Sequence, residues 1–83
     1  MNENYAIHNL EEAKEHLEAI INELKKTKDL GEIDGDLRAS FLELYWHINK
    51  VWNAKNISQQ DIDNSTEEQF DEWCKFPKDM EEI

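Results

Sequence analysis

The sequence predicts an all-α protein, in which two long antiparallel helices form a hairpin and a short C-terminal helix completes a small three-helix bundle. Two Gly and one Pro in 83 residues are too few for the turns of an all-β protein. Apolar residues between positions 4 and 27 recur at spacings of three and four, and positions 37–52 are apolar almost all the way round a helix. A chain of this length forms one small core, so we expect a single domain, 1–83.

The first helix is expected over about 4–27, with Asn4 or Asn9 capping its start. Its predicted core stripe consists of Ala6, Leu10, Ala13, Leu17, Ile20 and Leu24, widened by Ile21. Lys25 and Lys26 lie at the end where the helix dipole favours cations. If Leu17 is central in the core, its truncation to Ala should cost about 2–4 kcal/mol.

The second helix is expected over about 35–55, after a linker in which Leu30 and Ile33 fold over the end of the bundle and Asp34 or Asp36 caps the helix. One of its faces is predicted to enter the core and carries Leu37, Phe41, Leu44, Ile48 and Val51. For Ile48, too, truncation to Ala is expected to cost about 2–4 kcal/mol.

Another face of the second helix is also apolar. It carries Leu42 and Trp46 beside Asn49 and Asn53, and one neighbouring helix cannot cover both faces. Either the C-terminal helix covers these four residues, or they form an interface with a partner. We expect Trp52, at the shoulder of the core face, to be more buried than Trp46.

The C-terminal third contains two helix starts. Ser58 is expected to cap a short turn at about 59–63, and Ser65 or Thr66 to cap a third helix over about 66–75, which stops before Pro77. Residues 79–83 are expected to be a frayed tail.

The formal net charge is -11, and residues 58–83 contribute nine acids and two bases. Such a surface repels nucleic acid and anionic membranes and attracts basic proteins. No segment has the length and apolarity of a membrane span. The single cysteine, Cys74, allows no intramolecular disulfide, so we expect a cytoplasmic protein.

Two Glu/His pairs are candidate metal ligands. Glu12 and His16 are four residues apart, as are Glu43 and His47, and antiparallel helices could bring the pairs together. Dimetal bundles, however, use a Glu-x-x-His spacing of three, and both pairs lie off the apolar stripes, where water competes. We therefore interpret them as surface histidines near carboxylates, and expect no metal or cofactor.

Calcium is a further candidate, since Asp61, Asp63 and Glu72 occupy ligand positions of an EF-hand loop. The glycine that the loop requires is replaced by Thr66, and a helix start accounts for these residues better. Asp61, Asp63 and Glu72 are thus weak candidates only.

Nothing in the sequence predicts an enzyme. There is no phosphate-binding glycine loop and no Cys-x-x-Cys, and Cys74 has acidic neighbours that disfavour a thiolate. The favoured function is a non-catalytic protein–protein interaction module or a self-associating bundle, with a homodimer through the second helix as one form. The alternative is an acidic inhibitor, of the immunity type or a nucleic-acid mimic, that binds a basic protein through residues 58–83. A metal-binding bundle ranks third.

Overall fold

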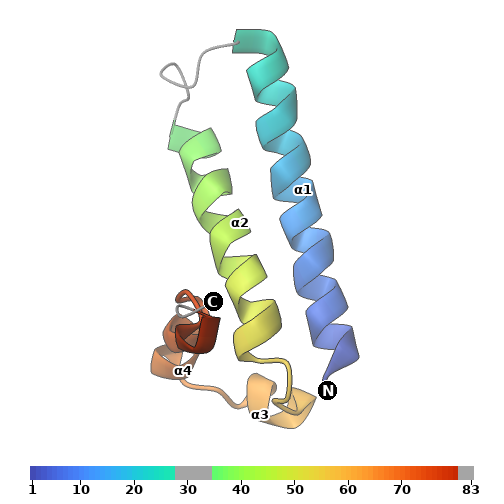
Figure 1. The fold of residues 1–83 in the computed structure, drawn as a ribbon, viewed down its shortest axis with the longest axis vertical. Helices are drawn as coiled ribbons and strands as arrows, with labels where there is room; N and C mark the ends of the chain where they lie inside the picture. The colour runs from blue at the N-terminus through green and yellow to red at the C-terminus, as the bar shows by residue number, and fades with distance from the viewer. Residues whose placement is uncertain (28–34, 81–83) are drawn as a thin grey trace.

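A computed structural model of the chain describes residues 1–27 and 35–80. Its helices are α1 (Glu3–Thr27), α2 (Gly35–Asn53), α3 (Gln59–Asp63) and α4 (Glu67–Trp73), followed by the short 3-10 helix η2 (Lys78–Met80). The described residues contain no strand, and α1 packs along α2 as an antiparallel hairpin (Figure 1). The predicted all-α hairpin is confirmed.

The helix boundaries agree with the predicted ones to within two residues, because local capping sets most of them. Ser58 Oγ accepts the backbone N–H of Asp61 at 3.1 Å, as expected. Thr66 and Gln69 form a reciprocal capping box at the start of α4. At the start of α1, however, Asn2 rather than Asn4 or Asn9 accepts a first-turn N–H, that of Tyr5, at 3.1 Å.

Some of the structural expectations concern residues at or beyond the edges of the described ranges. The predicted frayed tail begins too early, because residues 79 and 80 belong to η2; residues 81–83 lie outside the described residues. The predicted packing of Leu30 and Ile33, and the capping role of Asp34, also lie outside them.

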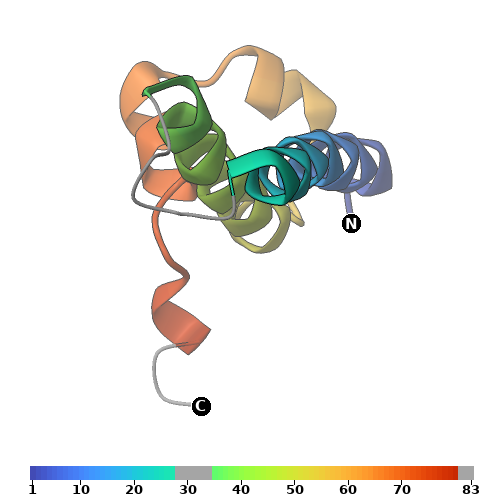
Figure 2. The ribbon, with the colours of Figure 1, turned by 90° about the horizontal axis from the view of Figure 1, so that it is seen from above.

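The short helices and η2 lie on opposite sides of the hairpin. Viewed along the hairpin, α3 and α4 are on one side of the α1–α2 layer and η2 is on the other (Figure 2). Helix α2 packs against both α1 and α4 and is therefore central. The molecule measures 42 × 28 × 23 Å, and its shortest dimension is about two helix diameters. A body so thin cannot enclose every apolar face of its helices.

The contact between the two long helices includes only part of the predicted core stripe. On α1 the buried residues are Ala6, Asn9, Ala13 and Ile20. Leu10 and Leu17 are 47% and 46% exposed. The prediction that both belong to the core of the single chain is therefore wrong, whereas the prediction for Ala6, Ala13 and Ile20 on the same stripe is confirmed. The helices meet on the side of the stripe that carries these residues and Asn9, so the larger side chains of Leu10 and Leu17 are turned outward.

Helix α2 likewise buries only part of its predicted core face. Ile48 is 47% exposed and Phe41 is 43% exposed, although both belong to the predicted core face. Leu37, on that face, is buried. Trp52 and Trp46 are 37% and 38% exposed, so the expected difference between them is absent.

Candidate functional site

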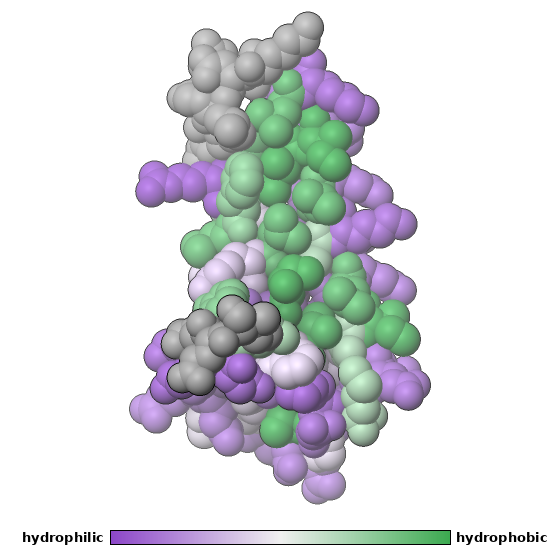
Figure 3. Space-filling model, in the orientation of Figure 1, coloured by the Kyte–Doolittle hydropathy of each residue, from purple (hydrophilic) through white to green (hydrophobic). Residues whose placement is uncertain are grey.

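A band of exposed apolar side chains runs along the hairpin on the side opposite α3 and α4. Figure 3 shows it as a continuous apolar strip between α1 and α2. We call it the apolar band and define it by the exposed large hydrophobic residues that share this face: Ile7, Leu10, Leu17, Ile21, Phe41, Tyr45, Ile48 and Trp52. At 100° per residue, each helix contributes four of them to one side. Both helices therefore direct their bulkiest side chains to the same surface.

The segment after α4 closes one end of the apolar band. Phe76 lines an apolar hollow of about 390 Å³ together with Phe41, Tyr45 and Ile48. The indole N–H of Trp52 lies 3.0 Å from each carboxylate oxygen of Asp79 and donates to that group. Phe76 is itself 49% exposed, so this segment extends the apolar surface as well as bounding it.

Charged side chains of both signs lie along the edges of the apolar band. The helical angles place Lys14 and Lys25 beside it on α1, with Glu18 just beyond, and place Arg38 beside it on α2. All four side chains are exposed. Charge near the band is thus mixed in sign, although the protein as a whole carries -11.

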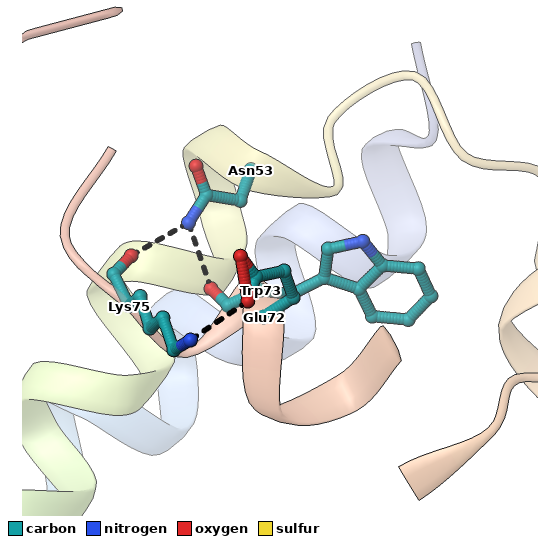
Figure 4. Close-up of polar contacts among 4 residues, drawn as sticks. All are labelled: Asn53, Glu72, Trp73 and Lys75. Carbon is teal, nitrogen blue, oxygen red and sulfur yellow. Dashed lines mark hydrogen bonds and ion pairs between the residues drawn. The ribbon is translucent and has the colours of Figure 1, made fainter. Parts of the chain in front are cut away.

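The other apolar face of α2 is partly covered by α4, and two predicted interface residues hold that helix in place. Asn49 is buried and donates from Nδ2 to the carbonyl of Cys74 at 2.8 Å. Asn53 donates to the carbonyls of Trp73 and Lys75, at 2.9 and 2.7 Å (Figure 4). These side chains satisfy the carbonyls at the end of α4, which have no partner within the helix.

Leu42 and Trp46, the other two predicted interface residues, remain accessible at 49% and 38%. Trp46 lines a hollow of about 290 Å³ with Phe70 and Cys74. Cys74 itself is buried, and burial raises the pKa of its thiol, which disfavours a nucleophilic thiolate. An interface role for Leu42 and Trp46 stays a prediction.

The two Glu/His pairs meet across the hairpin. One ligand atom each from Glu12, His16 and His47 lie within 4.8 Å of one another. His16 Nε2 is 2.9 Å from Glu43 Oε2, and the two imidazole rings stack with centroids 5.6 Å apart. All four side chains are partly buried at the polar edge of the α1–α2 contact. The same helix contact that exposes the apolar band brings these residues together.

Asn9 orients His47. Asn9 is fully buried, and its Nδ2 donates to the Tyr5 carbonyl at 2.9 Å, which fixes the direction of the amide. Its Oδ1 therefore faces His47 Nδ1 at 2.8 Å and accepts a hydrogen bond from the Nδ1–H group. His47 Nε2 is left with a lone pair. Burial, the positive charge of Lys50 and proximity to His16 lower the pKa of His47, which favours the neutral imidazole.

The sequence pattern gave no functional reason to select Asn9. The only available signal is an amide between Ala6 and Ala13 on the predicted core stripe. A buried amide needs partners, so an Asn at such a position indicates a polar contact across the helices.

Lys50 is almost completely buried between α2 and α4. Its ammonium lies 4.5 Å from the centre of the Phe70 ring, a cation–π contact, and burial lowers its pKa. It also lines an open groove of about 480 Å³ with Tyr5, His8 and Asn9. Lys50 therefore adds a positive charge close to the histidines.

The weak calcium candidates do not come together. Among the described residues, Glu12, His16 and His47 are the only group of three or more such side chains that could hold a metal ion, and Asp61, Asp63 and Glu72 form none. Asp63 accepts a hydrogen bond from Gln59, and Glu72 pairs with Lys75 at 2.9 Å (Figure 4). Helices α3 and α4 occupy the segment in which a calcium loop would lie.

The chain matches no protein-family model, no curated protein and no solved structure. Within the described residues, none of the helices combines the length and the apolarity needed to cross a membrane.

Proposed function

We propose that this chain is a non-catalytic, cytoplasmic interaction module that pairs with a second copy of itself through the apolar band. The observation that carries the proposal is the continuous exposed band across both long helices. Two hairpins facing each other through their bands form a four-helix bundle. A two-fold axis makes such an interface self-complementary, because the same surface serves both protomers.

The exposed area of the apolar band is large enough for an interface with a second copy of the chain. Its residues are between 37% and 51% exposed. With ~80 Å² per side chain and Phe76 included, the band offers ~700 Å² per protomer, close to the ~800 Å² that each partner buries in a standard interface. The largest apolar patch on a typical monomer covers only ~300–600 Å².

The composition of the surface also favours self-association. The centre of the apolar band is uncharged and includes Phe41, Tyr45 and Trp52, residue types that are enriched at interfaces. Lys14, Lys25 and Arg38 border the band together with Glu18 and Asp79, so charges of both signs are available at its edges. A mixed-sign border can be self-complementary across a two-fold axis.

The proposal is tested by placing a charge on either face of α2. Ile48 and Leu42 have almost equal exposure, 47% and 49%, on different faces of one helix. Ile48→Glu puts a carboxylate in the middle of the apolar band, and Leu42→Glu is the matched control. Sedimentation velocity should give a dimer for the wild type and for Leu42→Glu, and a monomer for Ile48→Glu. Far-UV circular dichroism should show all three to be helical.

Other outcomes overturn the proposal in different ways. A helical wild type that stays monomeric at ~100 µM would exclude self-association of useful affinity. Dissociation by Leu42→Glu but not by Ile48→Glu would move the interface to the Leu42–Trp46 face. If Ile48→Glu were unfolded, the band would belong to the core of the single chain.

A further inference from the structure

We propose that Glu12, His16 and His47 bind one divalent transition-metal ion per chain, such as Zn²⁺. The two histidines and the carboxylate come from the two long helices and converge at the polar edge of their contact. Imidazole nitrogens and carboxylate oxygens are the usual non-thiolate ligands of Zn²⁺, and three protein ligands leave a fourth position for water. This site lies apart from the apolar band and does not depend on pairing of the chains.

The candidate ligand atoms must move closer together to hold one metal ion. The three ligand atoms lie within 4.8 Å of one another. In a tetrahedral site with bonds of ~2.0–2.2 Å, ligand atoms are ~3.3–3.6 Å apart. Contraction by ~1.5 Å is within reach of side-chain rotation, particularly for the long side chain of Glu12. Glu12 and His16 are one helical turn apart on the same face of α1, so both can reach one ion.

Each histidine has one ring nitrogen engaged by a protein group, which leaves the other for a metal. Asn9 Oδ1 accepts from His47 Nδ1 at 2.8 Å, and Glu43 Oε2 lies 2.9 Å from His16 Nε2. Metal-binding histidines commonly make a second hydrogen bond to a carboxylate or amide oxygen, which fixes the tautomer and the ring orientation. The buried Asn9 serves this purpose for His47, and the carboxylate of Glu43 serves it for His16.

The charges around the cluster favour a cation between these side chains. Around His47, the carboxylates of Glu12 and Glu43 outnumber the one nearby cation, Lys50. Stacked rings at 5.6 Å would repel each other if both histidines were protonated. One divalent ion would neutralise the carboxylates and use the lone pairs of both neutral rings. All three ligands are only partly buried, so an ion can enter from solvent.

Zinc titration of the untagged protein tests the site. Isothermal titration calorimetry and non-denaturing mass spectrometry should show one Zn²⁺ per chain. His16→Gln and His47→Gln should each weaken binding at least tenfold, and Glu43→Gln should weaken it by about 10–100-fold, as loss of an orienting partner does. His8→Gln is the matched control, because His8 is the third histidine of the chain, lies on α1 and is exposed.

A second measurement, the visible absorption of bound Co²⁺, reports the coordination geometry of the site. Co²⁺ in the same site should give visible absorption bands, and His16→Gln or His47→Gln should remove them. The monomeric Ile48→Glu variant should still bind one ion, so failure of the pairing proposal and failure of the metal proposal are distinguishable. Circular dichroism verifies that each variant is folded.

The metal proposal is overturned if no Zn²⁺ binds at ~100 µM, or if His8→Gln weakens binding as much as His47→Gln does. In either case the Glu/His cluster would be a structural polar contact that fixes the register of the hairpin.

Discussion

Truncation of Leu17 and of Ile20 should have different consequences, although both lie on the stripe that the sequence assigns to the core. In the single chain Ile20 is 4% exposed and Leu17 is 46% exposed. Ile20→Ala therefore removes a core side chain, whereas Leu17→Ala removes a side chain that is about half exposed to solvent. If two chains pair through the apolar band, the exposed half of Leu17 becomes buried only in the dimer.

The expected magnitudes follow from these exposures. Ile20→Ala should cost about 2–5 kcal/mol of chain stability, as other core truncations do. Full burial of a leucine side chain is worth about 2 kcal/mol, so Leu17→Ala should cost about 1 kcal/mol in the single chain. It should cost about 1 kcal/mol more per protomer on pairing. Two protomers give about 2 kcal/mol, which weakens the dimer roughly 30-fold.

Two assays separate these effects. Guanidinium denaturation at low protein concentration measures stability of the single chain, and sedimentation velocity over a concentration series measures the dimer dissociation constant. Ile20→Ala should alter mainly the first quantity, and Leu17→Ala mainly the second. The reasoning is refuted if Leu17→Ala costs as much chain stability as Ile20→Ala and leaves the dissociation constant unchanged.

Two further predictions concern the polar contacts of α2. The pKa of His47 is lowered from 6.5 in the folded chain, so as the pH falls through 6.5 the unfolded chain takes up this proton first and stability decreases. His47→Gln should make that decrease shallower in pH-dependent thermal melts, and an unchanged slope would contradict it. Asn49→Ala leaves the Cys74 carbonyl without its partner and should cost about 1–3 kcal/mol in denaturant unfolding; a change below about 0.5 kcal/mol would show that the bond contributes nothing.

The helices could be predicted from the sequence because their signals are local. Ser58 and Thr66 cap the starts of α3 and α4, and Pro77 follows the end of α4. The residues that determine each helix boundary therefore lie within a few positions of that boundary in the sequence. The spacing of Leu10 and Leu17 likewise gives the apolar face of α1 without reference to the rest of the chain.

The rotation of the two long helices about their axes could not be predicted, because it depends on what else packs nearby. Periodicity identifies the apolar stripe but does not say whether its centre or its flank meets the partner helix. Here the flank with Ala13 and Asn9 makes the contact, so Leu17 and Ile48 lie outside the core of the single chain.

The same rotation explains the histidines. Residues four apart share a helix face, and this makes Glu12 a neighbour of His16 from sequence alone. The angular distance of His16 and His47 from the apolar stripes, however, predicts that both side chains are exposed to solvent. Only the observed helix contact, with Asn9 buried beside His47, places the two rings against each other.

The most direct test of pairing through the apolar band is the mass of the untagged wild-type chain under non-denaturing conditions at near-physiological salt. We expect a species of twice the 9.9 kDa chain mass, which dissociates on dilution. A folded species of 9.9 kDa at every concentration tested would contradict pairing. No second copy of the chain would then cover the exposed side chains of Leu17 and Ile48.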